Sequence, residues 1–251
     1  MTTEEELFER ELEIFRTEAE AGTQFLSAYL AVHAVASKHK AVHRLLNEAP
    51  LFWNTCLAGL QAASFMALGR IFDNDSNHNL GKLLRITQAH PEIFSKAALG
   101  RRKQGDSSEP PAWLPEYLRD SYEPTTRDFR RIRAHARKRR KIYEKNYRDI
   151  RHKWFAHKVV SEQTEIRALF SNASTRELQQ LFAFLSWLYE TLWELFFNGR
   201  KVVLRPLRYS VKRILGSPLP NRQPRGVHEK ITHEAEQFLR AASTLVRKAD
   251  W

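Results

Sequence analysis

Two stretches of the chain, residues 52–72 and 178–197, are apolar on almost every side when they are read at helical spacing. Neither shows the alternation of apolar and polar residues that is typical of a half-buried strand. A helix that is apolar all round lies in the middle of a bundle, because neighbouring elements must cover every face. The rest of the chain is rich in Leu, Ala, Glu, Arg and Lys and contains only nine Gly, which favours helix as well. We therefore predict an all-α fold, a helical bundle.

Capping residues and prolines divide the chain into predicted helices. The first helix begins at Thr2 or Thr3 and runs to about residue 39, with Gly22 as a point where it bends or divides. Ser174 and Glu177 form a capping box for the second apolar helix. The later helices are predicted over residues 50–72, 80–88, from 91 onward, 124–157, 174–197 and 228–248.

The distribution of Gly, Pro and Ser predicts two regions. Residues 1–198 form one helical domain, interrupted by an exposed loop at about 100–115. Asn198-Gly199 ends the last helix of that domain. Residues 199–251 form an additional region, a basic connector followed by a C-terminal helix that packs on or beside the domain.

Several protein classes are excluded by composition. The single Cys56 excludes an internal disulfide and fits a reducing cytosol. Residues 1–20 are acidic, which is unlike a signal peptide. Residues 181–197 carry Glu190 and Glu194 and are shorter than the roughly 20 residues that cross a bilayer. We expect a soluble, cytoplasmic protein with no membrane contact, in which these two glutamates are semi-buried partners for arginine rather than a catalytic pair.

Positive charge is concentrated in two segments. Residues 124–158 hold fourteen Lys and Arg against three acidic residues, and residues 199–230 hold nine against one. Such clustering is typical of proteins that bind a polyanion, and we expect the partner to be RNA. Tyr143 and Tyr147 are more consistent with the core than with base stacking. The candidate RNA-binding residues are Arg130, Arg133, Arg137, Arg140, Lys153 and Lys158.

An arginine followed closely by a histidine occurs at four places, and the pair Arg151 and His157 stands out by its context. It has a polar residue, His152, directly after the arginine and apolar residues before the second histidine. Arginine binds phosphate through its planar fork, and histidine exchanges a proton near neutral pH. In a regular α-helix the two side chains lie roughly 120° apart. A loosened helix end or a second copy of the chain must therefore complete the site.

The sequence offers little support for a metal or a cofactor. His39 and His43 have helical spacing compatible with a metal, but no third ligand is identifiable. A glycine-rich phosphate loop is also missing from the sequence. We expect neither a cofactor nor a metal site.

Residues 151–158, Arg-His-Lys-Trp-Phe-Ala-His-Lys, resemble the signature of the HEPN superfamily (higher eukaryote and prokaryote nucleotide-binding). Upstream, residues 66–73 and 79–84 resemble a segment of its AbiU-like abortive-infection branch, with Asn79-Leu80 in place of Ser-Ile. The similarity covers about residues 7–197. It implies a HEPN-like helical bundle with additional helices and a basic C-terminal extension.

Members of this superfamily are helical bundles that dimerise, and many are metal-independent endoribonucleases. The resemblance implies that Arg151 holds the phosphate, that His157 acts as acid or base on the ribose 2′-hydroxyl, and that His152 takes the polar position. Asp73 is implied to lie nearby in a supporting role, as a cap or in an ion pair to Arg70 or Arg151.

Our expectation is thus an endoribonuclease of a phage-defence or toxin–antitoxin system, acting on RNA as a homodimer. The alternative is a non-catalytic helical module that binds RNA or protein. A third possibility is a toxin that becomes active only when an antitoxin or regulatory partner leaves.

Overall fold

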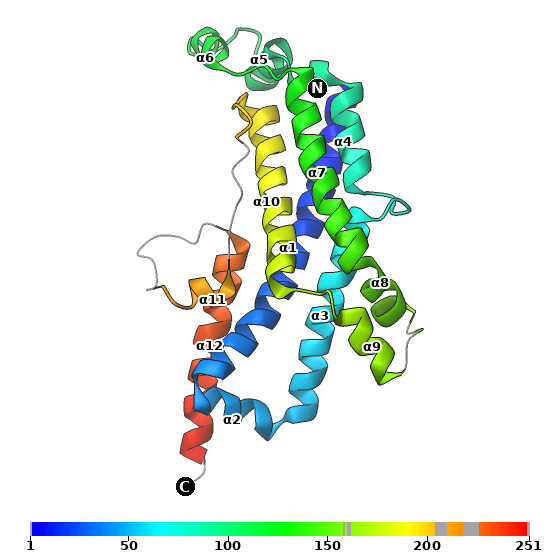
Figure 1. The fold of residues 1–251 in the computed structure, drawn as a ribbon. Helices are drawn as coiled ribbons and strands as arrows, with labels where there is room; N and C mark the ends of the chain where they lie inside the picture. Colours follow the sequence, from blue (N-terminus) through cyan, green and yellow to red (C-terminus); the bar gives the residue numbers. More distant parts are fainter. Residues whose placement is uncertain (1, 158, 160–161, 204–209, 218–225, 250–251) are drawn as a thin grey trace. The chain divides into compact units, whose positions relative to one another are not determined.

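The computed structural model describes residues 2–157, 159, 162–203, 210–217 and 226–249 (Figure 1). Every regular element among them is a helix, and this part of the chain contains no strand. The predicted all-α fold is therefore confirmed.

The chain divides into two compact units, neither of which is continuous in sequence. The first unit comprises residues 1–18, 69–145 and 183–207, and the second comprises residues 19–68, 146–182 and 208–251. The long helices α1 (Thr3–Lys38), α3 (Pro50–Phe72) and α10 (Thr175–Asn198) contribute residues to both units. The sequence-based division at residue 198 stays a prediction.

Aromatic side chains form the core of the first unit. Phe8 of α1 lies 5.0 Å from Phe94 and 4.8 Å from Phe196 of α10, measured between ring centroids. Phe94 also lies 5.1 Å from Phe129. These rings hold together segments that are far apart in sequence. The other elements of this unit are α4 (Leu80–Ala89), the 3-10 turn η1 (Pro91–Phe94), α5 (Lys96–Gln104), α6 (Leu114–Asp120) and α7 (Thr126–Asn146).

A buried ion pair fixes the start of α1 in the first unit. Arg102 donates to the Glu5 carboxylate at 2.6 Å, and both side chains are almost fully buried. The same guanidinium donates to the carbonyls of Ile93 (2.9 Å) and Phe196 (2.7 Å). The desolvated charges are therefore neutralised and hydrogen-bonded, as buried charges must be.

The second unit has an aliphatic core formed by three helices. Val32 and Val35 of α1, Val42 of α2 and Leu239 of α12 are buried against one another. The elements here are α2 (Lys40–Glu48), α8 (Arg148–Ile150), the π-helix η2 (Arg151–Ala156), α9 (Gln163–Phe170), α11 (Val211–Ile214) and α12 (Val227–Ala249).

Gly22 does not split α1, which runs unbroken from Thr3 to Lys38. Its role is close packing. A Cβ at this position would lie 2.5 Å from a ring atom of Phe182 and 2.8 Å from the Cβ of Ala67. Glycine therefore lets α1 approach α3 and α10 inside the second unit.

We expect Gly22→Ala to destabilise the protein by about 1–3 kcal/mol, since the methyl group overpacks a filled core. The higher helix propensity of alanine offsets up to about 1 kcal/mol of this loss. Thermal unfolding followed by circular dichroism measures the change. Gly59→Ala, at a helical position where a Cβ would meet nothing within 4 Å, is the matched control and should stabilise slightly. An unchanged midpoint for Gly22→Ala would contradict the close-packing role.

The apolar helix α3 is buried only in part. Phe65, Ala67 and Leu68 are buried, whereas Leu51 and Phe52 at its start are 81% and 60% exposed. By length and composition α3 is the one helix among the described residues that could cross a membrane, and 39% of its apolar window is buried. Burial in the core therefore explains the apolar composition of the second half of α3. At its start, apolar side chains are exposed in the part of the chain that the structure describes.

Most predicted helices are present, and two predictions were wrong in detail. The helix predicted over residues 124–157 is interrupted at Tyr147, whose backbone has φ −130° and ψ −26°. The loop predicted at 100–115 is shorter, because α5 continues to Gln104 and α6 begins at Leu114. Gly199 adopts φ +55° and ends α10, as predicted.

Candidate functional site

Tyr147 interrupts the helix that leads to the Arg–His motif. Its side chain is fully buried, and its hydroxyl accepts the backbone N–H of Ser174 at 3.1 Å. The same hydroxyl lies 2.9 Å from the Ser174 carbonyl and 3.0 Å from the Glu177 carboxylate. Burial raises the pKa of Tyr147. The hydrogen bonds of Tyr147 thus connect the chain just before the motif to the first turn of α10.

The predicted capping box at the start of α10 is replaced by this contact. The N–H of Ser174 donates to Tyr147, not to Glu177. Glu177 instead accepts from the side-chain amide of Asn146 at 2.9 Å. The sequence analysis missed the contacts of Tyr147 with Ser174 and of Asn146 with Glu177. The only signal for them was Glu177, which the analysis assigned to the capping box.

The motif itself forms a π-helix, Arg151–Ala156. The backbone N–H of His157 donates to the carbonyl of His152, five residues earlier, at 3.0 Å. In an α-helix two residues five apart point about 140° apart, but in a π-helix they lie about one turn above each other. The imidazole rings of His152 and His157 accordingly stack, with centroids 6.1 Å apart and an interplanar angle of 27°.

The arginine of the motif contacts the first of the two histidines. Arg151 Nη2 lies 2.5 Å from Nε2 of His152. Arginine is always a donor, so this Nε2 must be the acceptor and His152 is neutral in this arrangement. Arg151 and His152 are half-buried, and His157 is exposed. Within one chain, Arg151 therefore contacts His152 and His152 stacks on His157, so that two contacts connect the three residues of the predicted catalytic set.

Aromatic packing explains why the helix adopts this wider register. Phe155 lies 4.9 Å from Phe65 of α3, measured between centroids, and Ile150 is buried. These inward residues are five positions apart, which matches a π-turn. Phe170 of α9 contacts Phe155 at 6.4 Å and Trp154 at 6.3 Å. Trp154 and Phe155 therefore both pack against Phe170, and Phe155 also packs against Phe65.

Arg70 and Asp73, for which a supporting role was predicted, belong to the first unit. Arg151, His152 and His157 belong to the second unit. Asp73 accepts from the hydroxyl of Tyr143 at 3.1 Å, and Arg70 donates to Glu18 at 2.7 Å. Asn79, the residue that departs from the expected serine, caps α4 by accepting the N–H of Lys82 at 2.9 Å. Asparagine and serine are equivalent caps, so this departure leaves the local structure intact.

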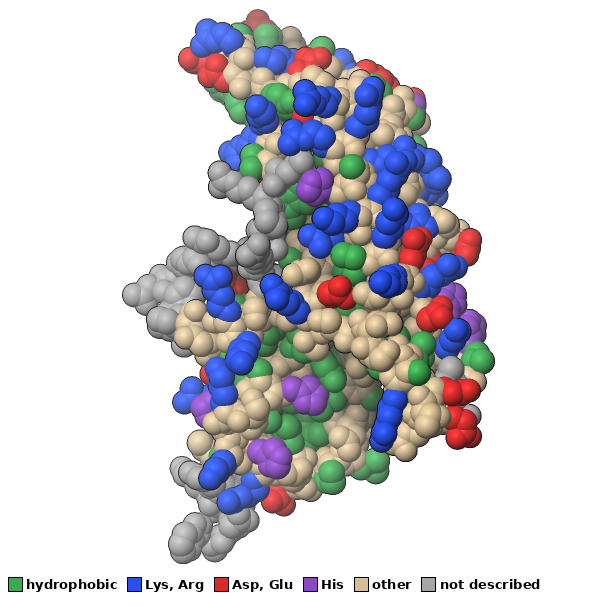
Figure 2. Space-filling model, viewed as in Figure 1, with side chains coloured by type: hydrophobic (Ala, Val, Ile, Leu, Met, Phe, Trp, Pro, Cys, Tyr) green, Lys and Arg blue, Asp and Glu red, His purple; other side chains and the backbone are tan. Residues whose placement is uncertain are grey.

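The candidate RNA-binding residues of α7 fall into two classes. Arg130 and Arg137 are exposed, and neither forms an ion pair among the described residues. Arg133 is hydrogen-bonded to Gln88, and Arg140 pairs with Glu144 at 2.8 Å. Figure 2 shows Lys and Arg side chains gathered over α7. Arg130 and Arg137 are therefore the two candidates on this helix that are available to a ligand.

The two other candidate RNA-binding residues are Lys153 and Lys158. Lys153 is exposed and pairs with Asp149 at 2.8 Å, and Lys158 lies outside the described residues. Tyr143 and Tyr147 are fully buried, which confirms their assignment to the core. Glu194 is half-buried and pairs with Arg200 at 3.3 Å, as predicted, whereas Glu190 is exposed, so the prediction of a semi-buried side chain was wrong for Glu190.

Sequence reasoning missed a second combination of aromatic and basic side chains. A cavity of about 900 Å³ in the first unit is lined by Trp113, Tyr117 and Tyr122. Lys103 Nζ lies 5.5 Å from the Tyr117 ring centroid, and Lys201 Nζ lies 5.7 Å from that of Tyr122. The sequence signal was present in these aromatics, but part of the segment was assigned to a loop.

Across the described ranges, no three His, Cys, Asp or Glu side chains are grouped so that they could hold a metal ion. His43 is hydrogen-bonded to Asn47, and His39 precedes α2.

Comparison with known proteins gives one informative result. The family model HEPN_AbiU2, described as AbiU2, matches residues 5–214. The match includes Arg151, His152 and His157, together with Asp73 and Arg70. No curated protein and no solved structure shows a significant match.

Proposed function

The chain belongs to the AbiU2 family of HEPN domains, and on that premise we propose that it is an endoribonuclease that cleaves RNA without a metal ion. The observation that carries the proposal is the cluster of Arg151, His152 and His157 in one π-turn. π-helical turns are rare and occur frequently at functional sites. Abortive infection is the proposed context, since the family is that of AbiU2.

The chemistry follows from what RNA itself provides. Its 2′-hydroxyl is a nucleophile next to the phosphorus, so an enzyme needs only to position it, accept its proton and neutralise the crowded phosphate. His157 is exposed and takes the 2′ proton as the general base. Arg151 contacts the phosphate oxygens. The bond from phosphorus to the 5′-oxygen breaks, the 5′-oxygen takes a proton from solvent water, and a 2′,3′-cyclic phosphate remains.

His152 positions Arg151 in this mechanism. The contact between Arg151 Nη2 and His152 Nε2 holds the guanidinium at the edge of the His152 imidazole. Because it stacks on His157, His152 also limits the rotation of that ring. Together the two contacts orient the site before a ligand arrives, which is the main requirement of electrostatic catalysis.

A second copy of the chain is part of the proposal. Leu51 and Phe52 leave an exposed apolar end on α3. Exposed large apolar groups that lie together favour association. A homodimer would place two Arg–His clusters in one assembly, and a partner protein that binds there would regulate both.

We expect the purified protein to cleave RNA in the presence of EDTA and to leave cyclic-phosphate ends, which mass spectrometry of the products identifies. A preparation of Arg151→Ala, purified in parallel, controls for contaminating nuclease. Activity that is lost with chelator and restored by magnesium would contradict the mechanism. Tight RNA binding without cleavage would favour the alternative, a non-catalytic RNA-binding module, for which the exposed arginines of α7 are the supporting observation.

RNA binding should weaken steeply with salt. For single strands the slope of log affinity against log salt is about −0.7 per phosphate contact. Changing Arg130 and Arg137 to Gln should therefore flatten the slope by roughly 1.4 if each contacts one phosphate. Fluorescence anisotropy of a labelled RNA measures this. Arg119→Gln is the matched control, because Arg119 is exposed but paired with Glu116. An equal slope in the double variant would show that these arginines only face solvent.

A further inference from the structure

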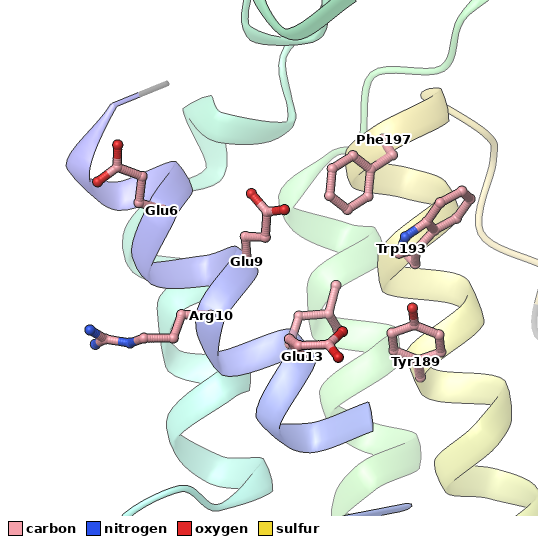
Figure 3. Close-up of a pocket in the computed structure, with 8 residues that line it drawn as sticks. Glu6, Glu9, Arg10, Glu13, Tyr189, Trp193 and Phe197 are labelled. Atoms are coloured by element: carbon pink, nitrogen blue, oxygen red, sulfur yellow. The ribbon is translucent and has the colours of Figure 1, made fainter. Parts of the chain in front are cut away.

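An acidic and aromatic groove lies in the first unit, between the start of α1 and the end of α10 (Figure 3). Glu6, Glu9 and Glu13 of α1 lie along one side, at spacings of three and four residues. The other side consists of aromatic rings that repeat every fourth residue of α10. The cavity has a volume of about 480 Å³ and is completed by Arg10, Leu12, Tyr189, Trp193 and Phe197.

Two of the three carboxylates, those of Glu9 and Glu13, face the same space as the rings, whereas Glu6 points away from α10. In Figure 3, Glu9 and Glu13 project toward α10, whereas Arg10 extends away from it. Trp193 is 36% exposed, whereas the neighbouring Leu192 and Leu195 of α10 are buried. Negative charge beside the face of an aromatic ring attracts a cation from two sides, by an ion pair and by a cation–π interaction. The groove therefore favours a basic ligand and repels RNA.

The chain itself shows how such a groove holds an arginine. Arg16 donates to the Glu13 carboxylate at 2.9 Å, and its guanidinium lies 6.0 Å from the ring centroid of Tyr189. One turn earlier on α1, Glu9 projects toward the part of α10 that carries Trp193 and Phe197 (Figure 3). The charge of Glu9 acts on the buried Arg102, but the guanidinium of Arg102 is hydrogen-bonded to Glu5 and to the carbonyls of Ile93 and Phe196. The carboxylate of Glu9 therefore stays available to a cation that enters the groove.

We propose that this groove is the docking site for a basic helix of a second protein, one that carries arginine at positions four residues apart. The spacing argues for a helix, because side chains four residues apart lie on one face and rise about 6 Å, as do the rings of Tyr189, Trp193 and Phe197. The charge argues for arginine, since its planar guanidinium both stacks on a ring and forks onto a carboxylate. The recognition is that of an amphipathic helix in a groove. The inference does not depend on RNA cleavage.

The test uses a fluorescein-labelled synthetic peptide with arginine at every fourth position of an alanine–glutamine background, and anisotropy as the readout with the full chain. The same peptide with citrulline for arginine keeps the shape and removes the charge. We expect the arginine peptide to bind, its affinity to fall with salt, and the citrulline peptide to bind at least about tenfold more weakly.

Variants of the chain locate the contact. Glu9→Gln should weaken binding of the arginine peptide about tenfold, and Trp193→Ala should do so to a similar extent. Glu4→Gln, the same change on the same helix but outside the groove, should leave the affinity unchanged. Circular dichroism verifies that Trp193→Ala is folded, and Glu9→Gln tests the proposal independently if it is not.

Three outcomes would overturn the proposal. The arginine and citrulline peptides could bind equally, or Glu9→Gln and Glu4→Gln could behave alike. Alternatively, the peptide could fail to bind while Trp193→Ala abolishes self-association of the chain, which would make a second copy the occupant. RNA cleavage by Glu9→Gln, measured in the same preparations, separates failure of this docking site from failure of the proposed ribonuclease function.

Discussion

Replacing His157 with alanine should reduce the rate of RNA cleavage by about 10²–10⁴-fold, the usual contribution of a general base. Arg151→Ala should cause a loss of at least similar size, because the other cation of the π-helix, Lys153, is paired with Asp149. Single-turnover cleavage of a labelled RNA measures both rates. The helical content should not change, since His157 is exposed and Arg151 is only half-buried.

Two further variants refine the assignment of roles. Arg151→Lys keeps the charge but loses the fork and the contact to His152, so it should recover only a small part of the activity. His135→Ala, on the same basic region of sequence but far outside the motif, is the matched histidine control and should cleave normally. Normal cleavage by both Arg151→Ala and His157→Ala would place the active site elsewhere.

Mixing the Arg151→Ala and His157→Ala chains tests whether a dimer shares the site. Both residues come from one π-turn in the structure, so each complete site should need one unmodified chain, and the mixture should stay inactive. Recovered activity would instead show that one site draws its arginine and its histidine from different chains. Light scattering of the same samples gives the oligomeric state.

Tyr147→Ala should be the most destabilising single substitution near the site, at about 3–5 kcal/mol, the usual loss for truncating a buried aromatic side chain. Its ring contacts Phe65, with centroids 6.1 Å apart, and its hydroxyl serves Ser174 and Glu177. Tyr147→Phe removes only the hydroxyl and should cost about 1–3 kcal/mol, because a backbone N–H then lacks its partner. Urea unfolding measures both. Equal midpoints for the wild type and Tyr147→Phe would show that the hydroxyl contributes nothing.

The same residue predicts a dependence on pH. Burial raises the pKa of Tyr147 in the folded protein above its value of about 10 in an unfolded chain. The folded state therefore holds the phenol proton more tightly, and this contribution is complete below pH 10 and is lost as the pH rises above it. The wild type should thus lose stability above pH 10 more steeply than Tyr147→Phe, which has no proton to lose.

Much of the fold could be predicted from the sequence because local patterns carry it. The buried stripe Phe129, Ile132, Ala136 and Tyr143 follows three- and four-residue steps, and α7 is a helix with that stripe inward. Asn198-Gly199 ends α10, since glycine adopts the positive φ that a helix end requires. The family was also readable, because residues 151–158 contain its motif, and the family match over residues 5–214 agrees.

The interruption of the long helix could not be predicted in this way. Neither proline nor glycine lies near Tyr147, and the weak helix formers Asn146 and Asp149 do not by themselves end a helix. The break exists because the Tyr147 hydroxyl is paired with Ser174 and Glu177, which lie about thirty residues later in the chain. A contact of that range has no local signature, and tertiary packing overrides helix propensity here.

By itself, the sequence determined which residues of the candidate site belong together, Arg151, His152 and His157, and that they would lie on a helix. Only the tertiary structure decided how they meet. At α-helical spacing the outer two point roughly 120° apart. Packing of Phe155 on Phe65, with Ile150 also buried, sets a five-residue step, and that step stacks His152 on His157. The physical reason is that α-helical and π-helical hydrogen bonding differ little in backbone free energy. The packing of one aromatic ring is enough to favour the π-helix here.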